Sequence, residues 1–302
     1  MTDPKLHDDE VDIDARLVQQ LVASQFPQWA AMPITAVASA GTDNALFRIG
    51  DGLVARLPKI HWAVDNIARE FDWLTTHGER LPLAVPQPIA LGAAGENYPW
   101  PWGIYEWLDG INPAAEPSRL DSATATQLAE FVVALHDVGA PDGPATGRGV
   151  PLAERDRYVR SALRKLDGIV DVDSAHGLWE FSLELPTWHG PNVWLHGDIK
   201  AGNMLARDGV LTAVIDFGCV CVGDPACDLI VAWNMLSGDA RTTFRSATGV
   251  DDATWLRGRG WALSIALIEI PYYLHTNPVM IREAHHVIAE VLANFRETTT
   301  PQ

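Results

Sequence analysis

Hydrophobic positions near the start of the chain recur with helical spacing. The segment 13–26, "IDARLVQQLVASQF", has an apolar stripe that favours an amphipathic helix. The stripe consists of Ile13, Leu17, Leu21 and Val22. Asp12 is the predicted N-cap of this helix, and Pro27 ends it.

The next hundred or so residues have the pattern of strands broken by turns. The segments "ITAVASAGTDN", "ALFRIGDG" and "LVARLPK" are rich in β-forming residues, and Asp51 with Gly52 predicts a hairpin turn. A helix is expected around "DNIAREFDWLTTHG", followed by the strand-like segments "VPQPIALGA" and "PWGIYEWLDG". This part therefore predicts a sheet with one packed helix.

From about residue 120 the pattern becomes helical, which indicates an α+β fold for the whole chain. The expected helices are "SATATQLAEFVVALHDVG", "PLAERDRYVRSALRKLDG", "DATWLRGRGWALSIALIEI" and "PVMIREAHHVIAEVLANF". Residues 139–151, "GAPDGPATGRGVP", predict a surface loop between helices. Two short apolar runs, "VWLHGD" and "TAVIDFG", interrupt the helical part.

Composition narrows the class of protein. A chain of 302 residues with 47% hydrophobic content can form one large domain or two lobes. The net charge of −17, part of it in an acidic tail expected to be disordered over residues 1–12, argues against nucleic acid as a partner. Without a signal-like N-terminus or a long apolar run, we expect a cytoplasmic protein that does not bind membranes.

All three cysteines lie close together, at positions 219, 221 and 227. An odd number in a cytoplasmic chain argues against a disulfide framework. Cys219 and Cys221 have a C-x-C spacing that metals use, but a fourth ligand with zinc-like spacing is missing nearby. Unligated thiols are the favoured interpretation, and the function of the cluster stays open.

The stretch "HGDIKAGN" and the following "IDFG" contain the side chains that phosphoryl transfer requires. Such a reaction needs bound Mg²⁺, neutralised charge and an oriented hydroxyl. Asp198 is the candidate that accepts or orients the hydroxyl proton, and Lys200 can offset charge on the moving phosphate. Asn203 and Asp216 offer hard oxygen ligands for Mg²⁺.

The combination H-x-D-x-x-x-x-N plus D-F-G resembles the protein-kinase-like superfamily, and its H-G-D form is similar to that of aminoglycoside phosphotransferases. The resemblance runs from about residue 20 to 295. It implies a two-lobed kinase-like fold that uses ATP, or GTP, with Mg²⁺. The lobes implied are a nucleotide-binding lobe over residues 13–105, a hinge at 106–110 and a catalytic, substrate-binding lobe over 111–302.

The resemblance also implies functions for residues around the catalytic loop. "GDPACDL" extends the match, and Asp228 would brace that loop. His196 is interpreted as a packed residue that supports the same loop.

In the N-terminal part, Arg56 resembles the strand lysine that holds nucleotide phosphates, and Glu70 the helix glutamate that holds it. Lys59 is the alternative cation. Backbone amides of the loop that replaces the glycine-rich motif would contact the phosphates, and this loop comprises Gly41, Thr42, Asp43 and Asn44. Glu106 and Leu108 resemble the hinge positions that bind the nucleobase.

Two features outside the motifs have alternative explanations. Glu269 lies in an apolar run, where a carboxylate is costly unless it is paired. It either faces a substrate amine or pairs with an arginine such as Arg257 or Arg259. The tryptophans at 100, 102 and 107 are interpreted as core and hinge packing rather than as a stacking platform.

Only five residues separate Gly218 from Asp224, which leaves no room for the activation loop of a protein kinase. A small-molecule hydroxyl is therefore the expected acceptor, and the acidic composition suits a cationic one such as an aminoglycoside or another amino alcohol. The family implies a link with antibiotic resistance. A kinase of choline, homoserine, a sugar or a macrolide is the alternative, as is a catalytically silent nucleotide-binding module. The sequence predicts no oligomeric state.

Overall fold

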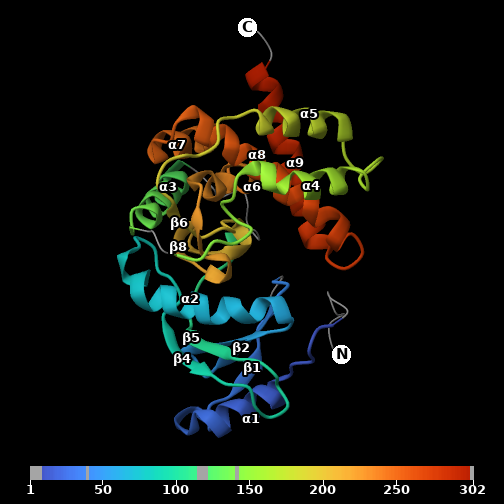
Figure 1. Ribbon diagram of the computed structural model, residues 1–302. Helices are drawn as coiled ribbons and strands as arrows, with labels where there is room; N and C mark the ends of the chain where they lie inside the picture. Colours follow the sequence, from blue (N-terminus) through green and yellow to red (C-terminus); the bar gives the residue numbers. More distant parts are fainter. Residues whose placement is uncertain (1–8, 39–40, 114–121, 140–142, 300–302) are drawn as a thin grey trace. The chain divides into compact units, whose positions relative to one another are not determined.

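The structure is a computed structural model that describes residues 9–38, 41–113, 122–139 and 143–299. The chain divides into two compact units (Figure 1). The first comprises Met1–Asn112 with Met204–Val220, and the second Pro113–Asn203 with Cys221–Gln302. Most of the predicted acidic tail, residues 1–8, lies outside the described residues. The division into functional lobes and a hinge stays a prediction.

The first unit contains a five-stranded antiparallel sheet in the order β1-β2-β3-β5-β4. Its strands are β1 (Ile34–Ala36), β2 (Asn44–Ile49), β3 (Leu53–Pro58), β4 (Pro88–Gly92) and β5 (Trp102–Glu106). The predicted hairpin is confirmed, because Ile49 pairs with Leu53. The positive φ of its turn falls on Gly50, at +55°. Glycine tolerates this conformation because it has no Cβ.

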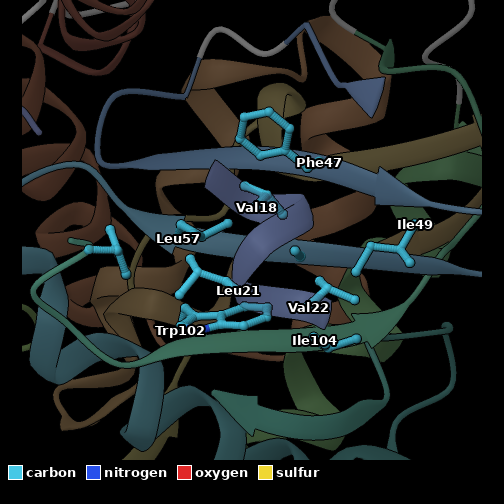
Figure 2. Packing of buried hydrophobic residues seen from close by; sticks show 10 residues of the cluster. Val18, Leu21, Val22, Phe47, Ile49, Leu57, Trp102 and Ile104 are labelled. Atoms are coloured by element: carbon cyan, nitrogen blue, oxygen red, sulfur yellow. The ribbon is translucent and has the colours of Figure 1, made fainter. Parts of the chain in front are cut away.

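Helix α1 (Ala15–Gln25) covers one face of this sheet (Figure 2). Its buried stripe packs against apolar side chains of β2, β3 and β5, among them Phe47 and Trp102. The prediction that Asp12 caps α1 is wrong. Asp14 is the N-cap, and its carboxylate accepts the backbone N–H of Leu17 at 2.8 Å. The local reason is that Asp14 directly precedes the first helical residue, where a cap oxygen reaches the third helical amide.

Helix α2 (Val64–His77) packs on the opposite face of the sheet. Side chains alternate between the two faces of a strand, so Ile104 joins the α1 core while Tyr105 contacts Phe71 of α2. The same alternation on β3 places Ala55 in the α1 core and Arg56 on the α2 face. The alternation of side chains along β3 therefore places the guanidinium of Arg56 next to α2.

The second part of the first unit is a hairpin of β7 (Met204–Arg207) and β8 (Val210–Val214). Ala206 exchanges two backbone hydrogen bonds with Ile111, both 2.8 Å long. On the other strand, Val214 donates to the carbonyl of Ala84 at 3.0 Å. These contacts attach β7 and β8 to residues distant in sequence and fix the place where the chain leaves β8.

The second unit is mainly helical, and its longest helices, α8 and α9, pack against each other. Its helices are α3 (Ser122–His136), α4 (Leu152–Leu163), α5 (Val172–Leu183), α6 (Val231–Asn234), α7 (Gly238–Thr248), α8 (Asp252–Tyr273) and α9 (Pro278–Thr299). All four helices predicted for this unit are confirmed, while α5, α6 and α7 were not predicted. A short antiparallel pair of β6 (Val193–Leu195) and β9 (Cys221–Gly223) lies beside them.

Short 3₁₀ helices connect several of these elements. They are η1 (Pro27–Trp29), η2 (His61–Ala63), η3 (Gly78–Arg80), η6 (Ala201–Asn203), η7 (Phe217–Cys219) and η8 (Pro225–Ile230). Within the described ranges, no helix is long and apolar enough to cross a membrane.

Candidate active site

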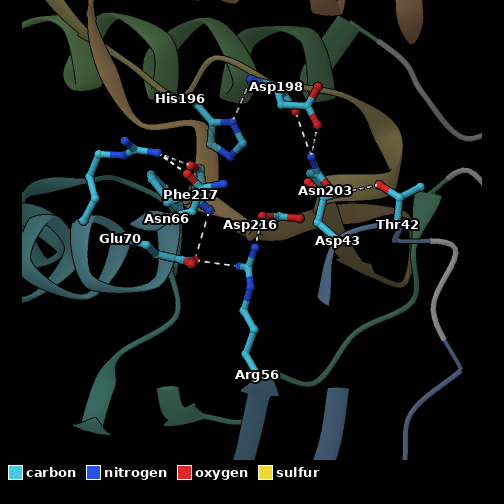
Figure 3. A network of polar contacts seen from close by, with 12 residues as sticks. Thr42, Asp43, Arg56, Asn66, Glu70, His196, Asp198, Asn203, Asp216 and Phe217 are labelled. Atoms are coloured by element: carbon cyan, nitrogen blue, oxygen red, sulfur yellow. Dashed lines mark hydrogen bonds and ion pairs between the residues drawn. The ribbon is translucent and has the colours of Figure 1, made fainter. Parts of the chain in front are cut away.

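In the first unit, Arg56, the predicted phosphate ligand, contacts both Glu70 of α2 and the predicted metal ligand Asp216. Its Nη1 lies 2.8 Å from Oε1 of Glu70. Its Nη2 donates to Oδ1 of Asp216, which follows β8 (Figure 3). Burial works against the arginine cation, but the Asp216 and Glu70 carboxylates raise the pKa of Arg56, so it stays charged.

The segment after β8 is fixed on α2. Phe217 is buried and stacks on Trp73 with ring centroids 5.2 Å apart, and its N–H donates to Oε1 of Glu70 at 3.1 Å. The carbonyl of Gly218 accepts Nη2 of Arg69 at 3.1 Å. Asp216 itself has φ +66°, which is uncommon for a residue with a Cβ, and its side chain is 41% exposed. The surrounding contacts hold this backbone conformation in place and present the carboxylate to solvent.

The loop between β1 and β2 carries the predicted phosphate-binding backbone. The predicted residues 41–44 all belong to the described part of the chain, and the hydroxyl of Thr42 donates to Asp43 at 2.9 Å. Asn44 opens β2, and with its amide oxygen turned toward Arg56 it accepts Nη2 at 3.0 Å. Lys59, the alternative cation, instead lies 3.6 Å from Glu10. The geometry therefore favours Arg56 over Lys59 as the cation joined to the predicted site.

The predicted hinge, residues 106–110, begins at the last residue of β5. Glu106 ends that strand with an exposed side chain, and its N–H donates to Gln87 at 2.9 Å. The half-buried Leu108 comes two residues later. Trp107 contacts Arg48, whose guanidinium lies 4.6 Å from the ring centroid. Among the three tryptophans singled out, Trp102 is fully buried in the core, in agreement with a packing function, and Trp100 is half-buried against that core.

In the second unit, the loop after β6 gathers Asp198, Lys200 and Asn203. Figure 3 shows the contact between Asp198 and Asn203. Nζ of Lys200 lies 3.1 Å from Oδ2 of Asp198, and Nδ2 of Asn203 donates to the same oxygen at 2.9 Å. Burial raises the pKa of Asp198, but Lys200 and Arg148 outweigh it and lower that pKa to about 2. The carboxylate is therefore ionised at neutral pH.

Asp228 supports this loop from η8. Its oxygens accept the backbone N–H groups of His196 at 3.0 Å and of Gly197 at 2.8 Å. Nε2 of His136, on α3, lies 3.2 Å from the same carboxylate. The fully buried His196 accepts the N–H of Asp198 through Nδ1 at 3.2 Å. A short turn thus obtains its backbone partners from a buried carboxylate and an imidazole.

The structure adds one residue that sequence reasoning missed. Nη2 of Arg148 lies 3.5 Å from Oδ1 of Asp198. Arg148 belongs to the segment 139–151, which was expected to be a plain surface loop. That expectation is wrong for residues 148–150, because they are partly or fully buried. The signal available in the sequence was "GRG", in which two glycines allow the backbone on both sides of a cation to approach other chain segments.

Glu269, on α8, is half-buried, and burial raises the pKa of this carboxyl even though Lys200 lowers it. The alternative that it pairs with Arg257 or Arg259 is wrong. Arg257 forms a two-point contact with Asp224, with Nε to Oδ2 at 2.7 Å and Nη2 to Oδ1 at 3.0 Å. The Nη1 of Arg259 instead contacts Asn294 and Thr298. Helical spacing explains why neither arginine pairs with Glu269. Arg257 and Arg259 precede Glu269 by 12 and 10 residues on α8, so each lies about three helical turns away from it.

The three cysteines form no disulfide. Cys221 and Cys227 are buried, and burial raises the pKa of the Cys227 thiol. Across the described ranges, no group of three or more histidine, cysteine, aspartate or glutamate side chains could hold a metal ion. The predicted Mg²⁺ ligands are not a group of this kind, because one of them, Asn203, is an asparagine and not one of these four residue types.

The fold is shared with kinase-like phosphotransferases. The GDP complex of aminoglycoside 2'-phosphotransferase-IIIa is similar to it with a TM-score of 0.71 and 18% identity, covering 94% of this chain and 100% of that chain. Macrolide 2'-phosphotransferase MphH from Brachybacterium faecium is similar with a TM-score of 0.61 and 21% identity, covering 96% and 99% of the two chains.

The sequence identifies the family. The profile of the Phosphotransferase enzyme family (APH) matches residues 34–261, so the chain belongs to this family and is a small-molecule phosphotransferase. A search of curated protein sequences found no significant match.

Proposed function

We propose that this protein transfers the γ-phosphate of ATP to a hydroxyl of a small molecule, with Mg²⁺ as cofactor. The observation that carries the proposal is the contact of the Asp198 carboxylate with Lys200 and Asn203 of the same loop. A carboxylate beside a cation and a hard-oxygen ligand is the arrangement that phosphoryl transfer requires. A cytoplasmic location accompanies this proposal as a prediction from the sequence.

Asn203 and Asp216 each offer a hard oxygen ligand for magnesium. The Nδ2 of Asn203 donates to Asp198, so its amide oxygen faces away from that carboxylate. Asp216 presents a carboxylate that is 41% exposed. We assign these two oxygens to Mg²⁺ because it prefers hard oxygen ligands together with nucleotide phosphates. Bound there, Mg²⁺ would neutralise charge on the β- and γ-phosphates.

The N-terminal residues are assigned to the nucleotide. Arg56, held by Glu70, would grip phosphate oxygens, and the backbone of residues 41–44 would add N–H donors. Because the N–H of Glu106 is bonded to Gln87, a nucleobase contact by Glu106 would use its carbonyl, with Leu108 as the neighbouring hinge position. Similar folds have been solved with GDP, with ADP and with ATP, so GTP is the alternative donor.

In the transfer step, the acceptor oxygen forms a bond to the γ-phosphorus while the bond to the β,γ-bridging oxygen breaks. Asp198 orients the acceptor hydroxyl and takes its proton as the new bond forms. Lys200 offsets the negative charge on the transferred group. Asp228 and His196 keep the loop in the conformation that presents Asp198.

A cationic acceptor is the favoured class. Glu269 is a half-buried carboxylate whose neighbouring charges include Lys200, and it would accept a hydrogen bond from a substrate amine. Similar structures contain kanamycin, gentamicin and streptomycin. For this chain we propose an aminoglycoside-like compound or another amino alcohol, and in that case antibiotic resistance is the physiological consequence. A macrolide, sugar, choline or homoserine is the alternative acceptor.

The test is nucleotide consumption with a panel of these acceptors, for the natural protein and for Asp198→Asn. We expect at least one acceptor to stimulate consumption, and we expect Asp198→Asn to lower kcat by about 10²- to 10⁴-fold with little change in nucleotide affinity. Full activity of Asp198→Asn would make this acid structural. Binding of nucleotide without turnover of any acceptor or water would favour the silent nucleotide-binding module.

A further inference from the structure

The two oxygens of the Asp198 carboxylate have different partners. Oδ2 accepts from Nζ of Lys200 at 3.1 Å and from Nδ2 of Asn203 at 2.9 Å. Oδ1 faces Nη2 of Arg148 at 3.5 Å. Since Oδ2 already has two donors, Oδ1 is the oxygen with room to accept a proton from an incoming hydroxyl.

We propose that Arg148 is a positioning residue for the acceptor half of the reaction: it holds the carboxylate of Asp198 in the rotation that presents Oδ1 to the acceptor hydroxyl. The proposal rests on the proposed function, in which Asp198 orients that hydroxyl. The contact at 3.5 Å is long for a charged hydrogen bond, so a hydroxyl can enter and donate to Oδ1 while Arg148 fixes the carboxylate from the side.

Arg148 itself is held by the backbone around it. The Asp224 N–H donates to the carbonyl of Gly149 at 2.9 Å, and the thiol of Cys221 contacts the carbonyl of Arg148 at 3.7 Å. Gly149 has φ +69°, and a Cβ there would lie 2.3 Å from Cδ1 of Leu195. Only glycine fits this close approach, so the loop is packed onto β9 and β6.

A second arginine completes the support. Arg155, on α4, donates to the carbonyl of Gly147 at 3.2 Å and to the hydroxyl of Ser264 at 2.5 Å, with its guanidinium 4.6 Å from the ring centroid of Trp261. Arg155 thereby links the loop beside Arg148 to α4 and α8, so these helices hold the loop in addition to β9.

The experiment compares Arg148→Gln with a matched control. Arg157→Gln removes the same charge from the exposed face of α4, where Arg157 stacks on Tyr158. Turnover is measured with the best acceptor of the panel, or with water when nucleotide hydrolysis is the faster reaction. We expect Arg148→Gln to lower kcat about 10- to 100-fold with nucleotide KM unchanged, because misplaced reacting groups cost rate rather than nucleotide binding. Arg157→Gln should behave as the natural protein.

Two further variants separate positioning from folding. Arg148→Lys keeps the charge and should recover part of the lost kcat. In the double variant Arg148→Gln/Asp198→Asn, the loss should be close to that of Asp198→Asn alone, because the two side chains act as one unit. If Arg148→Gln fails to fold, Arg148→Ala is measured in its place, and the Lys variant supplies the same comparison of kcat against KM.

The outcomes distinguish the two proposals. If Asp198→Asn keeps full activity, the proposed function and this inference both fall. If Asp198→Asn is impaired while Arg148→Gln matches Arg157→Gln, only the inference falls. Equal losses in kcat and nucleotide affinity, or losses that multiply in the double variant, would also overturn it, because Arg148 would then act on structure or independently of Asp198.

Discussion

Arg56 and Glu70 form a buried ion pair in which Nη1 of the arginine lies 2.8 Å from Oε1 of the glutamate. The pair connects β3 to α2, and the same Oε1 accepts the N–H of Phe217 at 3.1 Å. Glu70 therefore fixes both the cation and the backbone beside Asp216. Two predicted functions, phosphate binding and metal binding, depend on one glutamate.

This pair predicts different effects for the two candidate cations. Arg56→Ala leaves Glu70 buried without its cation, which should cost about 3–5 kcal/mol of unfolding free energy. It should also weaken nucleotide binding if the protein still folds. Lys59→Ala breaks one longer contact, 3.6 Å to Glu10, and should cost less than Arg56→Ala, because the Arg56 guanidinium contacts both Glu70 and Asp216. Urea unfolding and nucleotide titration measure both effects. Weaker nucleotide binding by Lys59→Ala alone would show that Lys59 holds the phosphates.

Replacement of Asp216 should abolish the dependence of nucleotide binding on Mg²⁺. Asp216→Asn removes a charged oxygen ligand and cripples turnover, while asparagine tolerates the left-handed backbone at this position. Calorimetry with and without Mg²⁺ measures the effect. Asp208→Asn is the matched control, because Asp208 is an exposed acid that also has a positive φ, +53°. An unchanged Mg²⁺ response in folded Asp216→Asn would refute the metal assignment.

Replacement by methionine should lower the free energy of unfolding by different amounts at two arginines of α8, Arg257 and Arg259. Arg257→Met leaves Asp224 buried without a cation and should cost about 3–5 kcal/mol. Arg259 is fully buried between Phe181 and Phe295, and its Nε and Nη2 have no hydrogen-bond partner within the described residues. Burial lowers the pKa of Arg259 to about 10. Arg259→Met should therefore cost at least about 2 kcal/mol less than Arg257→Met. Similar losses in urea unfolding would contradict this difference.

The free energy of unfolding should depend on pH in the acid range through the N-cap of α8. The Thr254 N–H, 2.6 Å from Oδ1 of Asp251, lowers the pKa of that carboxyl below its usual value of 3.8. The stabilisation is therefore present above the unfolded-state pKa and is lost as pH falls through the lower folded-state pKa. Asp251→Ala should cost about 1 kcal/mol at pH 7 and progressively less in acid. Asp251→Asn caps without charge and, like Asp251→Ala, lacks the titrating carboxyl, so the stability curves of the two variants should run parallel while that of the natural protein falls further in acid. A natural-protein curve parallel to those of both variants would contradict the assignment.

The sequence alone predicted those parts of the site whose residues lie close together along the chain. Asp198, Lys200 and Asn203 lie within six residues, so a single turn brings them together, and the structure does so. The alternation of β3 and the helical period of α2 likewise explain why Arg56 meets Glu70.

Contacts between distant segments could not be predicted in the same way. Arg148 precedes Asp198 by fifty residues, and its loop is rich in glycine and proline, which is typical of an exposed turn. The pairing of Arg257 with Asp224 was missed because each is one of several charged residues in its region. Neither contact follows from local spacing.

The close approach of Gly149 and Gly223 limits how this enzyme can be redesigned. A Cβ at Gly223 would lie 2.5 Å from the carbonyl oxygen of Gly149. Any loop transplanted here to change acceptor preference must therefore retain both glycines, whatever its length or composition between Pro144 and Gly147. Directed evolution of acceptor range should accordingly accumulate changes at the exposed tip of the loop, while its base stays invariant.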